Sequence, residues 1–407
     1  MKGRHLPVLR AAHQVHLLQG AQALFPDLVK AIDASMREVR METYIFHLDA
    51  TGQAMAQALE RAARRGVQVY LVMDGVGTPA LPPEWARRFD AAGVQWRIFL
   101  PLGRIGLLIP NHWRRLHRKL CVVDGQVGFC GGVNVLDDLY DPNHGALTAP
   151  RLDFAVRVSG PLVQAMHQTM VRFWWRQEAA YDARQADWLA IWDDLQQAVR
   201  PSPVSAPEAV PHAARGGMRA ALLLRDNLRH RGAIERAYRK AIAEAQREII
   251  IANAYFLPGR KLRQALIHAA RRGVRVRLLL QGRYEYFMQY HAVRMVYDVL
   301  LAAGIEIHEY RASFMHAKVA VVDQHWSTVG SSNLDPLSLL LAREANVVVN
   351  DAAFARELRE RLLRAIEEGS QRVDPAGSVT RSWRQRLLDR LAFGLMRLAV
   401  FINGKRY

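Results

Sequence analysis

The sequence has few cysteines and no long hydrophobic run. Among its 407 residues only Cys121 and Cys130 are cysteines, and both lie in short apolar runs. Two such cysteines exclude a disulfide framework and a spaced zinc-ligand cluster, and they indicate a reducing compartment. No stretch reaches the roughly 18 uninterrupted apolar residues of a membrane-spanning helix, and polar residues interrupt any signal-peptide core at the N-terminus. The sequence therefore predicts a protein that is soluble or bound to a membrane surface.

Acidic residues are also in deficit. The chain has 38 Asp and Glu against 56 Lys and Arg, a net charge of +18, while 50% of its residues are hydrophobic and 23% are charged. This apolar fraction excludes intrinsic disorder, and the positive charge favours nucleic acid, an anionic lipid surface or a phosphorylated substrate as partner. At roughly 150 residues per domain, the length predicts two or three domains.

The chain repeats one plan twice. Ala62–Val67 returns as Ala269–Val274, both with the sequence Ala-Ala-Arg-Arg-Gly-Val, and Ala91–Val94 returns as Ala302–Ile305. Strand and helix patterns alternate in each copy, which predicts an α/β fold with one sheet per copy and a glycine just past each helix that ends in Arg-Arg. The predicted divisions are an N-terminal domain (1–197), a proline-rich linker (198–217), a C-terminal domain (218–374) and a basic amphipathic segment (375–407).

One motif occurs in both copies without an insertion. Its members are His117, Lys119, Asp124, Gly131, Gly132 and Asn134 in the first copy, and His316, Lys318, Asp323, Gly330, Ser331 and Asn333 in the second. Every member is displaced by 199 positions, as 316 − 117 and 333 − 134 show. A lone histidine of this kind is usually a core residue with a satisfied partner. Repetition of six positions favours a functional site instead.

The motif suits phosphoryl chemistry. The runs 116–123 and 315–322 are predicted as buried strands, so each histidine shares a sheet face with the lysine two residues later. Lysine and amide donors would hold the oxygens of a phosphoryl group, and the glycines let the backbone approach it closely. One neutral imidazole attacks phosphorus while a second, protonated one delivers a proton to the leaving oxygen. This chemistry requires neither a metal nor another cofactor.

The duplicated motif resembles that of the phospholipase D superfamily over nearly the whole chain. Residues 253–259 and 330–338 resemble bacterial cardiolipin synthases, in particular the shorter B type without N-terminal membrane helices. The resemblance implies two pseudo-symmetric phospholipase D-type α/β domains, each a mixed β-sheet flanked by helices, with one active site at their interface.

The resemblance also implies roles for individual residues. His117 would be the nucleophile and His316 the general acid, although pseudo-symmetry leaves the order open. The phosphoryl group would be bound by Lys119, Lys318, Asn134 and Asn333, and the substrate would also contact Gly131, Gly132 and Ser331. Asp124 and Asp323 belong to the catalytic signature but tend to be structural in the family. Asp153 and Glu344 would orient the imidazoles, or would instead form ion pairs with Arg151 and Arg343.

The implied reaction is phosphatidyl transfer between two phosphatidylglycerol molecules, giving cardiolipin and glycerol through a phosphohistidine. The implied location is the cytoplasmic side of the bacterial inner membrane, as a peripheral protein. Phospholipid hydrolysis, headgroup exchange, nuclease activity and a lipid-binding scaffold are the alternatives. The basic, apolar stretches 104–119 and 381–407 favour an anionic membrane over nucleic acid. The alternative for the second stretch is a helix that docks on the protein or on a second protomer, and a homo-oligomer is compatible with the sequence.

Overall fold

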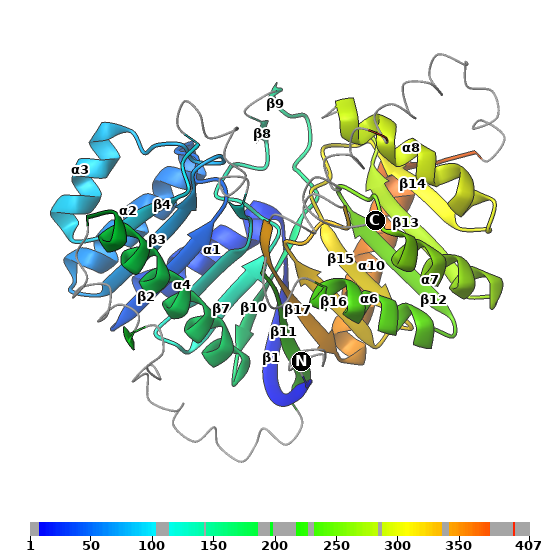
Figure 1. Ribbon diagram of the computed structural model, residues 1–407, viewed down its shortest axis with the longest axis horizontal. Helices are drawn as coiled ribbons and strands as arrows, with labels where there is room; N and C mark the ends of the chain where they lie inside the picture. The colour runs from blue at the N-terminus through cyan, green and yellow to red at the C-terminus, as the bar shows by residue number, and fades with distance from the viewer. Residues whose placement is uncertain are drawn as a thin grey trace.

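Figure 1 shows the computed structural model of the chain as two halves that lie side by side, blue to green and green to orange. The structure describes residues 8–102, 114–141, 144–185, 196–197, 217–226, 232–283, 287–335, 342–374 and 394. Most of the predicted linker, the predicted C-terminal segment and residues 104–113 therefore lie outside the described residues. Among the described residues, none of the helices is long and apolar enough to cross a bilayer.

The first half alternates strands and helices up to a long final helix. Its elements are β1 (Arg10–Gln19), α1 (Gly20–Asp33), β2 (Glu38–Thr43), α2 (Ala50–Arg64), β3 (Gln68–Asp74), α3 (Pro83–Ala92), β4 (Gln95–Phe99), β5 (Arg115–Leu116), β6 (Lys119–Val123), β7 (Val127–Gly131), β8 (Tyr140–Asp141), β9 (Gly145–Ala146), β10 (Phe154–Ser159) and α4 (Leu162–Gln185).

The second half follows the same order. Its elements are β11 (Met218–Arg225), α6 (Ala233–Glu244), β12 (Glu248–Asn253), α7 (Arg260–Arg271), β13 (Arg275–Gln281), α8 (Phe287–Leu301), β14 (Glu306–Tyr310), β15 (Lys318–Val322), β16 (Trp326–Gly330), β17 (Ala342–Asn350), α10 (Ala352–Gly369) and β18 (Ser370–Arg372).

The strand order confirms the duplicated α/β plan. The first half has the order β4-β3-β2-β6-β7-β10-β1, and the second half has the equivalent order β14-β13-β12-β15-β16-β17-β11. The sheets of the two copies are also joined, because β1 pairs with β11 and makes both halves one continuous sheet. Strand pairing at this seam satisfies backbone groups that two free sheet edges would leave unpaired. The seam lies at the centre of Figure 1.

A glycine follows the end of α2 and of α7, as predicted. Gly66 and Gly273, which follow the two Arg-Arg pairs, both have a φ of 90°. A side chain is strained in this left-handed region, so glycine is the natural residue just past the end of α2 and of α7. Each helix therefore stops at the same point, and the strand that follows begins in the same register.

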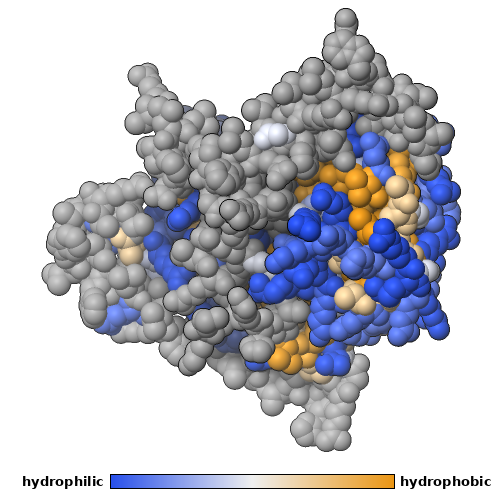
Figure 2. Space-filling view, turned by 45° about the vertical axis from the view of Figure 1, so that its right-hand side comes forward, coloured by the Kyte–Doolittle hydropathy of each residue, from blue (hydrophilic) through white to orange (hydrophobic). Residues whose placement is uncertain are grey.

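Three of the hydrophobic cores hold the layers together. One core contains α1, α2 and α3 with strands of the first half, and a second contains α6, α7 and α8 with strands of the second half. The third core contains α4 and α10 with strands of both halves, and β7 and β10 contact β16 and β17 there. Figure 2 shows apolar patches between hydrophilic side chains on the side of the second half. The shared core fixes the position of one half against the other.

Both cysteines are buried and free, as expected for small core residues. Burial raises the pKa of the Cys121 and Cys130 thiols to about 12. Neither thiol therefore forms a reactive thiolate at neutral pH.

Candidate active site

The backbone brings each motif histidine against the other half of the molecule. The predicted strand 116–123 is interrupted at His117: β5 ends before it, and β6 begins at Lys119. β5 pairs in parallel with β17, and the His117 N–H donates to the carbonyl of Arg343 over 3.0 Å. The second half repeats this arrangement, because the His316 N–H donates to the carbonyl of Leu152 over 2.9 Å.

This crossed pairing places each imidazole on a carboxylate from the opposite half. His117 Nδ1 lies 3.1 Å from Glu344 Oε1, and His316 Nδ1 lies 2.7 Å from Asp153 Oδ2. The carboxylate follows directly after the residue whose carbonyl accepts the histidine N–H. Backbone register therefore determines the contact between each ring and its carboxylate.

The alternative ion pairs with neighbouring arginines do not form in the described structure. Arg151 binds Asp141 instead, with Nη2 2.6 Å from Oδ2, and also donates to two backbone carbonyls. The guanidinium of Arg343 lies over the rings of Phe99 and Phe173, at 6.0 and 5.0 Å from their centroids. Neither arginine therefore competes with an imidazole for these carboxylates.

The two imidazoles face each other across the boundary between the halves. Their ring centroids are 6.5 Å apart, and their side chains are 15% exposed for His117 and 20% for His316. Lys119 and Lys318 are buried, and each ammonium donates to the backbone carbonyl of the histidine in its own motif. The rings are thus more accessible to a substrate than the ammonium groups behind them.

Burial shifts the basic groups toward their neutral forms. It lowers the pKa of His117 and, with the charges of Lys318 and Lys119, lowers the pKa of His316 well below its usual value. The pKa of Lys119 falls to about 7, again mainly through burial. These closely spaced basic groups make the site favourable for a phosphate.

The two carboxylates respond differently to burial. Burial raises the pKa of Asp153 to about 7, and the charge of Lys318 offsets only part of this effect. Burial also acts to raise the pKa of Glu344, but contacts with His117, Lys119 and Ser331 outweigh it and leave that pKa lowered. Glu344 is therefore ionised at neutral pH, whereas Asp153 holds a proton for part of the time.

The glycine and serine positions of the motif lie next to the carboxylates of Asp153 and Glu344. A Cβ on Gly132 would lie 2.3 Å from Asp153 Oδ1, and one on Gly131 would lie 2.5 Å from Ala155 Cα. Ser331, the equivalent of Gly132, donates its hydroxyl to Glu344. The structure thus places these positions next to the imidazole-orienting groups, and their contact with substrate stays a prediction.

The two asparagines differ in their partners. The side-chain oxygen of Asn134 accepts from the Ile45 N–H over 3.2 Å, which leaves the amide NH₂ as the donating end. Asn333 is 2% exposed, and its Oδ1 has no hydrogen-bond donor among the described residues. Both asparagines follow the strand that pairs with the motif lysine, so they lie at the same end of the sheet as the histidines.

The motif aspartates lie away from the histidines and hold a turn. Asp124 comes after the far end of β6, and its carboxylate accepts the N–H groups of residues 36–38 over 2.8–2.9 Å. Asp323 accepts the N–H groups of residues 246–248 in the same way over 2.7–2.9 Å. These contacts show a structural role for both carboxylates, and a catalytic role for them stays a prediction. Their backbone contacts anchor the start of β2 and β12.

Tyr44 is a site residue that the motif did not reveal. Its ring lies 4.9 Å from the His117 ring and 5.3 Å from Lys119 Nζ, measured to its centroid. Alignment of the copies at Phe46 and Phe256, which make equivalent bridges, places Ala254 at the corresponding point of the second half. Comparing residues just after β2 and β12 would have found this difference between the two halves.

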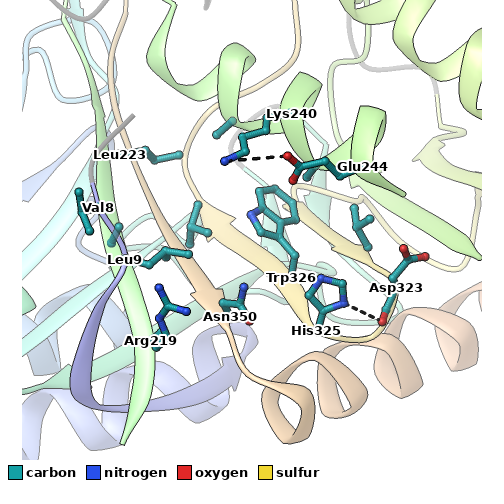
Figure 3. A pocket seen from close by; sticks show the side chains of 15 residues that line it. Val8, Leu9, Arg219, Leu223, Lys240, Glu244, Asp323, His325, Trp326 and Asn350 are labelled. Atoms are coloured by element: carbon teal, nitrogen blue, oxygen red, sulfur yellow. Dashed lines mark hydrogen bonds and ion pairs between the residues drawn. The ribbon is translucent and has the colours of Figure 1, made fainter. Parts of the chain in front are cut away.

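A cavity of about 390 Å³ lies at the opposite end of the second half (Figure 3). It is lined by α6 and by the ends of β11, β16 and β17, including Leu223, Lys240 and Trp326. Asp323 is the predicted site residue on its wall, and that carboxylate is already bound to backbone N–H groups. This cavity is distinct from the paired histidines.

A family model described as "Cardiolipin synthase, PLD-like domain" matches residues 28–149 and 238–366. These ranges contain both copies of the motif and more than half of the chain. The chain belongs to the cardiolipin synthase family of phospholipase D-like proteins. Membership confirms the resemblance drawn from the motifs and identifies the chain as a phosphatidyltransferase-type enzyme of the phospholipase D superfamily.

Members of the cardiolipin synthase family match along almost the whole chain. Cardiolipin synthase B of Escherichia coli (strain K12) is 36% identical over 400 residues, which cover 95% of this chain and 89% of that protein. Cardiolipin synthase A of Pseudomonas putida is 31% identical over 362 residues, covering 89% and 70%. The crystal structure of phosphatidylserine synthase from Haemophilus influenzae has the same fold, with a TM-score of 0.67 at 13% identity over 98% of this chain and 96% of that one.

Proposed function

We propose that this enzyme transfers a phosphatidyl group from one phosphatidylglycerol to another, giving cardiolipin and glycerol. The observation that carries the proposal is the pair of imidazoles, 6.5 Å apart between ring centroids, each bound by a carboxylate of the opposite half. This spacing leaves room for one phosphoryl group between the two rings. Phosphatidylglycerol is the donor because relatives of the chain bear the name cardiolipin synthase.

The first step forms a covalent intermediate on His117. Its Nε2 attacks the phosphorus of the first phosphatidylglycerol, and the bond from phosphorus to the glycerol headgroup oxygen breaks. His316, protonated at Nε2, gives that oxygen a proton, so glycerol leaves and phosphatidyl-His117 remains. Glu344 stabilises the positive charge that develops on the attacking ring.

The second step releases the product. Neutral His316 takes a proton from a hydroxyl of the second phosphatidylglycerol, whose oxygen then attacks phosphorus. The bond between phosphorus and His117 breaks, giving cardiolipin and restoring both histidines to their starting states. Water in place of that hydroxyl would give hydrolysis, so the second lipid must reach the intermediate before water does.

Four side-chain donors bind the phosphoryl oxygens in both steps. Lys119, Lys318, Asn134 and Asn333 supply them. The negative charge of the phosphodiester raises the pKa of His316 and Lys119 from their depressed values, which favours the protonated forms that the reaction needs. Substrate binding and activation of the acid are thereby coupled.

The enzyme acts as a peripheral protein on the cytoplasmic side of the bacterial inner membrane. Its net charge of +18 favours an anionic bilayer. The stretches 104–119 and 381–407 combine basic with apolar residues and supply the proposed membrane contacts.

The test is lipid turnover by purified protein. Liposomes that contain phosphatidylglycerol should yield cardiolipin and glycerol, read by mass spectrometry, and His117→Ala and His316→Ala should each lower the rate about 10⁴-fold. Labelled phosphatidylglycerol supplied at less than one molecule per enzyme, so that no second lipid follows, should leave labelled phosphatidyl-histidine on the protein. Phosphatidic acid as the main product would indicate hydrolysis, and cleaved DNA beside intact lipid would indicate a nuclease; either result would contradict the proposal.

A further inference from the structure

The residue before each catalytic histidine is held by a side chain outside the motif. The Leu116 N–H donates to Asp74 Oδ2 over 2.7 Å, and the Met315 N–H donates to Gln281 Oε1 over 3.2 Å. Asp74 is the last residue of β3, and Gln281 is the last residue of β13. Each acceptor therefore extends from a strand end to the backbone of the neighbouring segment.

The two contacts are equivalent in the duplicated fold. Asp74 and Gln281 are 207 positions apart (281 − 74), the same offset as the repeated Ala-Ala-Arg-Arg-Gly-Val segments. Leu116 and Met315 are 199 positions apart (315 − 116), as are the motifs. The same contact thus joins segments whose spacing differs between the halves, although the side chain is a carboxylate in one half and an amide in the other.

These contacts complete a frame around each histidine. The histidine's own N–H binds a carbonyl of the opposite half, and its Nδ1 faces a carboxylate of that half. The contact with Asp74 or Gln281 fixes the preceding peptide from the histidine's own half. Without it, the short segment before the ring is restrained mainly from across the boundary between the halves.

We propose that Asp74 and Gln281 are positioning residues for the transfer reaction, Asp74 for His117 and Gln281 for His316. Neither touches the reacting atoms; each holds the peptide that sets the ring against its carboxylate. Displacement of a reacting group by about 1 Å costs on the order of 10²-fold in rate, so this support matters for turnover. The inference rests on the proposed catalytic roles of the two histidines.

The two supports differ in strength. Asp74 is buried and also binds Arg115, with Oδ1 3.1 Å from Nη1, and the Val76 N–H over 2.8 Å. In the second half, Phe314 takes the position of Arg115, and Gln281 Nε2 has no hydrogen-bond acceptor among the described residues. Loss of the Asp74 side chain should therefore cost more than loss of the Gln281 side chain.

The test compares alanine and conservative variants of the two residues. Asp74→Ala should lower kcat on phosphatidylglycerol liposomes about 100-fold and Gln281→Ala about 10-fold, with KM within about threefold of the parent value. Gln281→Glu keeps an acceptor oxygen for Met315 and should restore most of the rate. Asp74→Asn keeps the acceptor for Leu116 but weakens the contact with Arg115, so it should lie between Asp74→Ala and the parent.

A second readout is independent of turnover. Side-chain ¹⁵N–¹H spectra of the full chain, assigned by the signals lost in His117→Ala and His316→Ala, report each imidazole separately. Asp74→Ala should move the His117 signals alone, and Gln281→Ala the His316 signals alone. If Asp74→Ala does not fold, Asp74→Asn takes its place. Unmoved ring signals, equal movement of both rings, or an unchanged kcat would overturn the proposal, even if the protein proves to act on another phosphodiester.

Discussion

The two halves of the site share one backbone plan but differ in the carboxylate that each supplies. The second half supplies Glu344, which binds His117 and the Ser331 hydroxyl. The first half supplies Asp153, which binds His316 and packs against Gly132, where any side chain would bring its Cβ too close to the carboxylate. Duplication therefore fixed the geometry of the site, and single side chains then gave the two imidazoles different surroundings.

That difference affects charge more than position. The contacts of Glu344 lower its pKa, whereas burial raises the pKa of Asp153 to about 7. His117 thus faces a carboxylate that is negatively charged at neutral pH. This supports His117 as the nucleophile, because its ring becomes positive when it attacks phosphorus. His316 shares a proton with its carboxyl partner near neutral pH, which suits a group that must both give and take a proton.

The largest expected effect is on stability, through Asp153. Its folded-state pKa of about 7 lies above the ordinary 3.8, so its contribution to stability is full below about pH 4 and is lost as the pH rises through 7. Asp153→Asn cannot ionise, so it should be more stable than the parent by about 4 kcal/mol at pH 8.5 and equal to it near pH 4.

Urea unfolding at both pH values measures this difference. Glu344→Gln is the matched control, because the lowered pKa of Glu344 predicts the opposite sign: that variant should lose stability at pH 8.5 relative to the parent. Equal stability of Asp153→Asn and the parent across the pH range would show that folding does not raise the pKa of Asp153.

The second effect is on catalysis by the same two variants. Glu344→Gln should lower kcat about 100-fold at every pH from 6 to 9, because an ionised group is removed throughout. Asp153→Asn should stay close to the parent at pH 5.5, where Asp153 holds its proton, and fall about tenfold below it at pH 8.5. The ratio of variant to parent kcat, measured along the pH range, shows both patterns.

These kcat ratios also test which histidine is the nucleophile and which is the general acid. Suppose that the ratio of variant to parent kcat does not change with pH for Asp153→Asn but does change for Glu344→Gln. The carboxylate that stays ionised would then be the one beside His316. The proposed nucleophile and general acid would then have to be exchanged.

The sequence predicted which residues form the site better than it predicted which of them contact each other. The 199-residue repeat was enough to find both histidines, both lysines and the duplicated α/β plan, because catalytic groups and strand patterns recur locally in each copy. The crossed contacts of Asp153 and Glu344 depend on how the halves pack against each other. No spacing within one copy contains that information.

The break in the strand at His117 has a similar origin. The run 116–123 has the apolar pattern of one strand, yet Leu116 pairs with Arg343 of the other half while Lys119 pairs with Gly131 of its own. Tertiary pairing thus overrides local pattern. Asp74 and Gln281 were missed because one is acidic and the other neutral, so only the matched contacts of the two folded halves reveal their equivalence.

The smallest expected effect comes from making one half resemble the other. Ser331→Gly gives the His117 side the residue that the His316 side has at Gly132, and removes a hydrogen bond to an ionised carboxylate. Such a bond contributes about 1.5 kcal/mol, so kcat should fall about tenfold while KM stays near its parent value.

Ser331→Thr keeps the hydroxyl and should retain most of the activity. Because the pKa of Glu344 also loses one of the contacts that lower it, the loss in Ser331→Gly should be greater at pH 6 than at pH 9. A loss that is equal for glycine and threonine would mean that position 331 acts through packing, and that the hydroxyl does not distinguish the two half-sites.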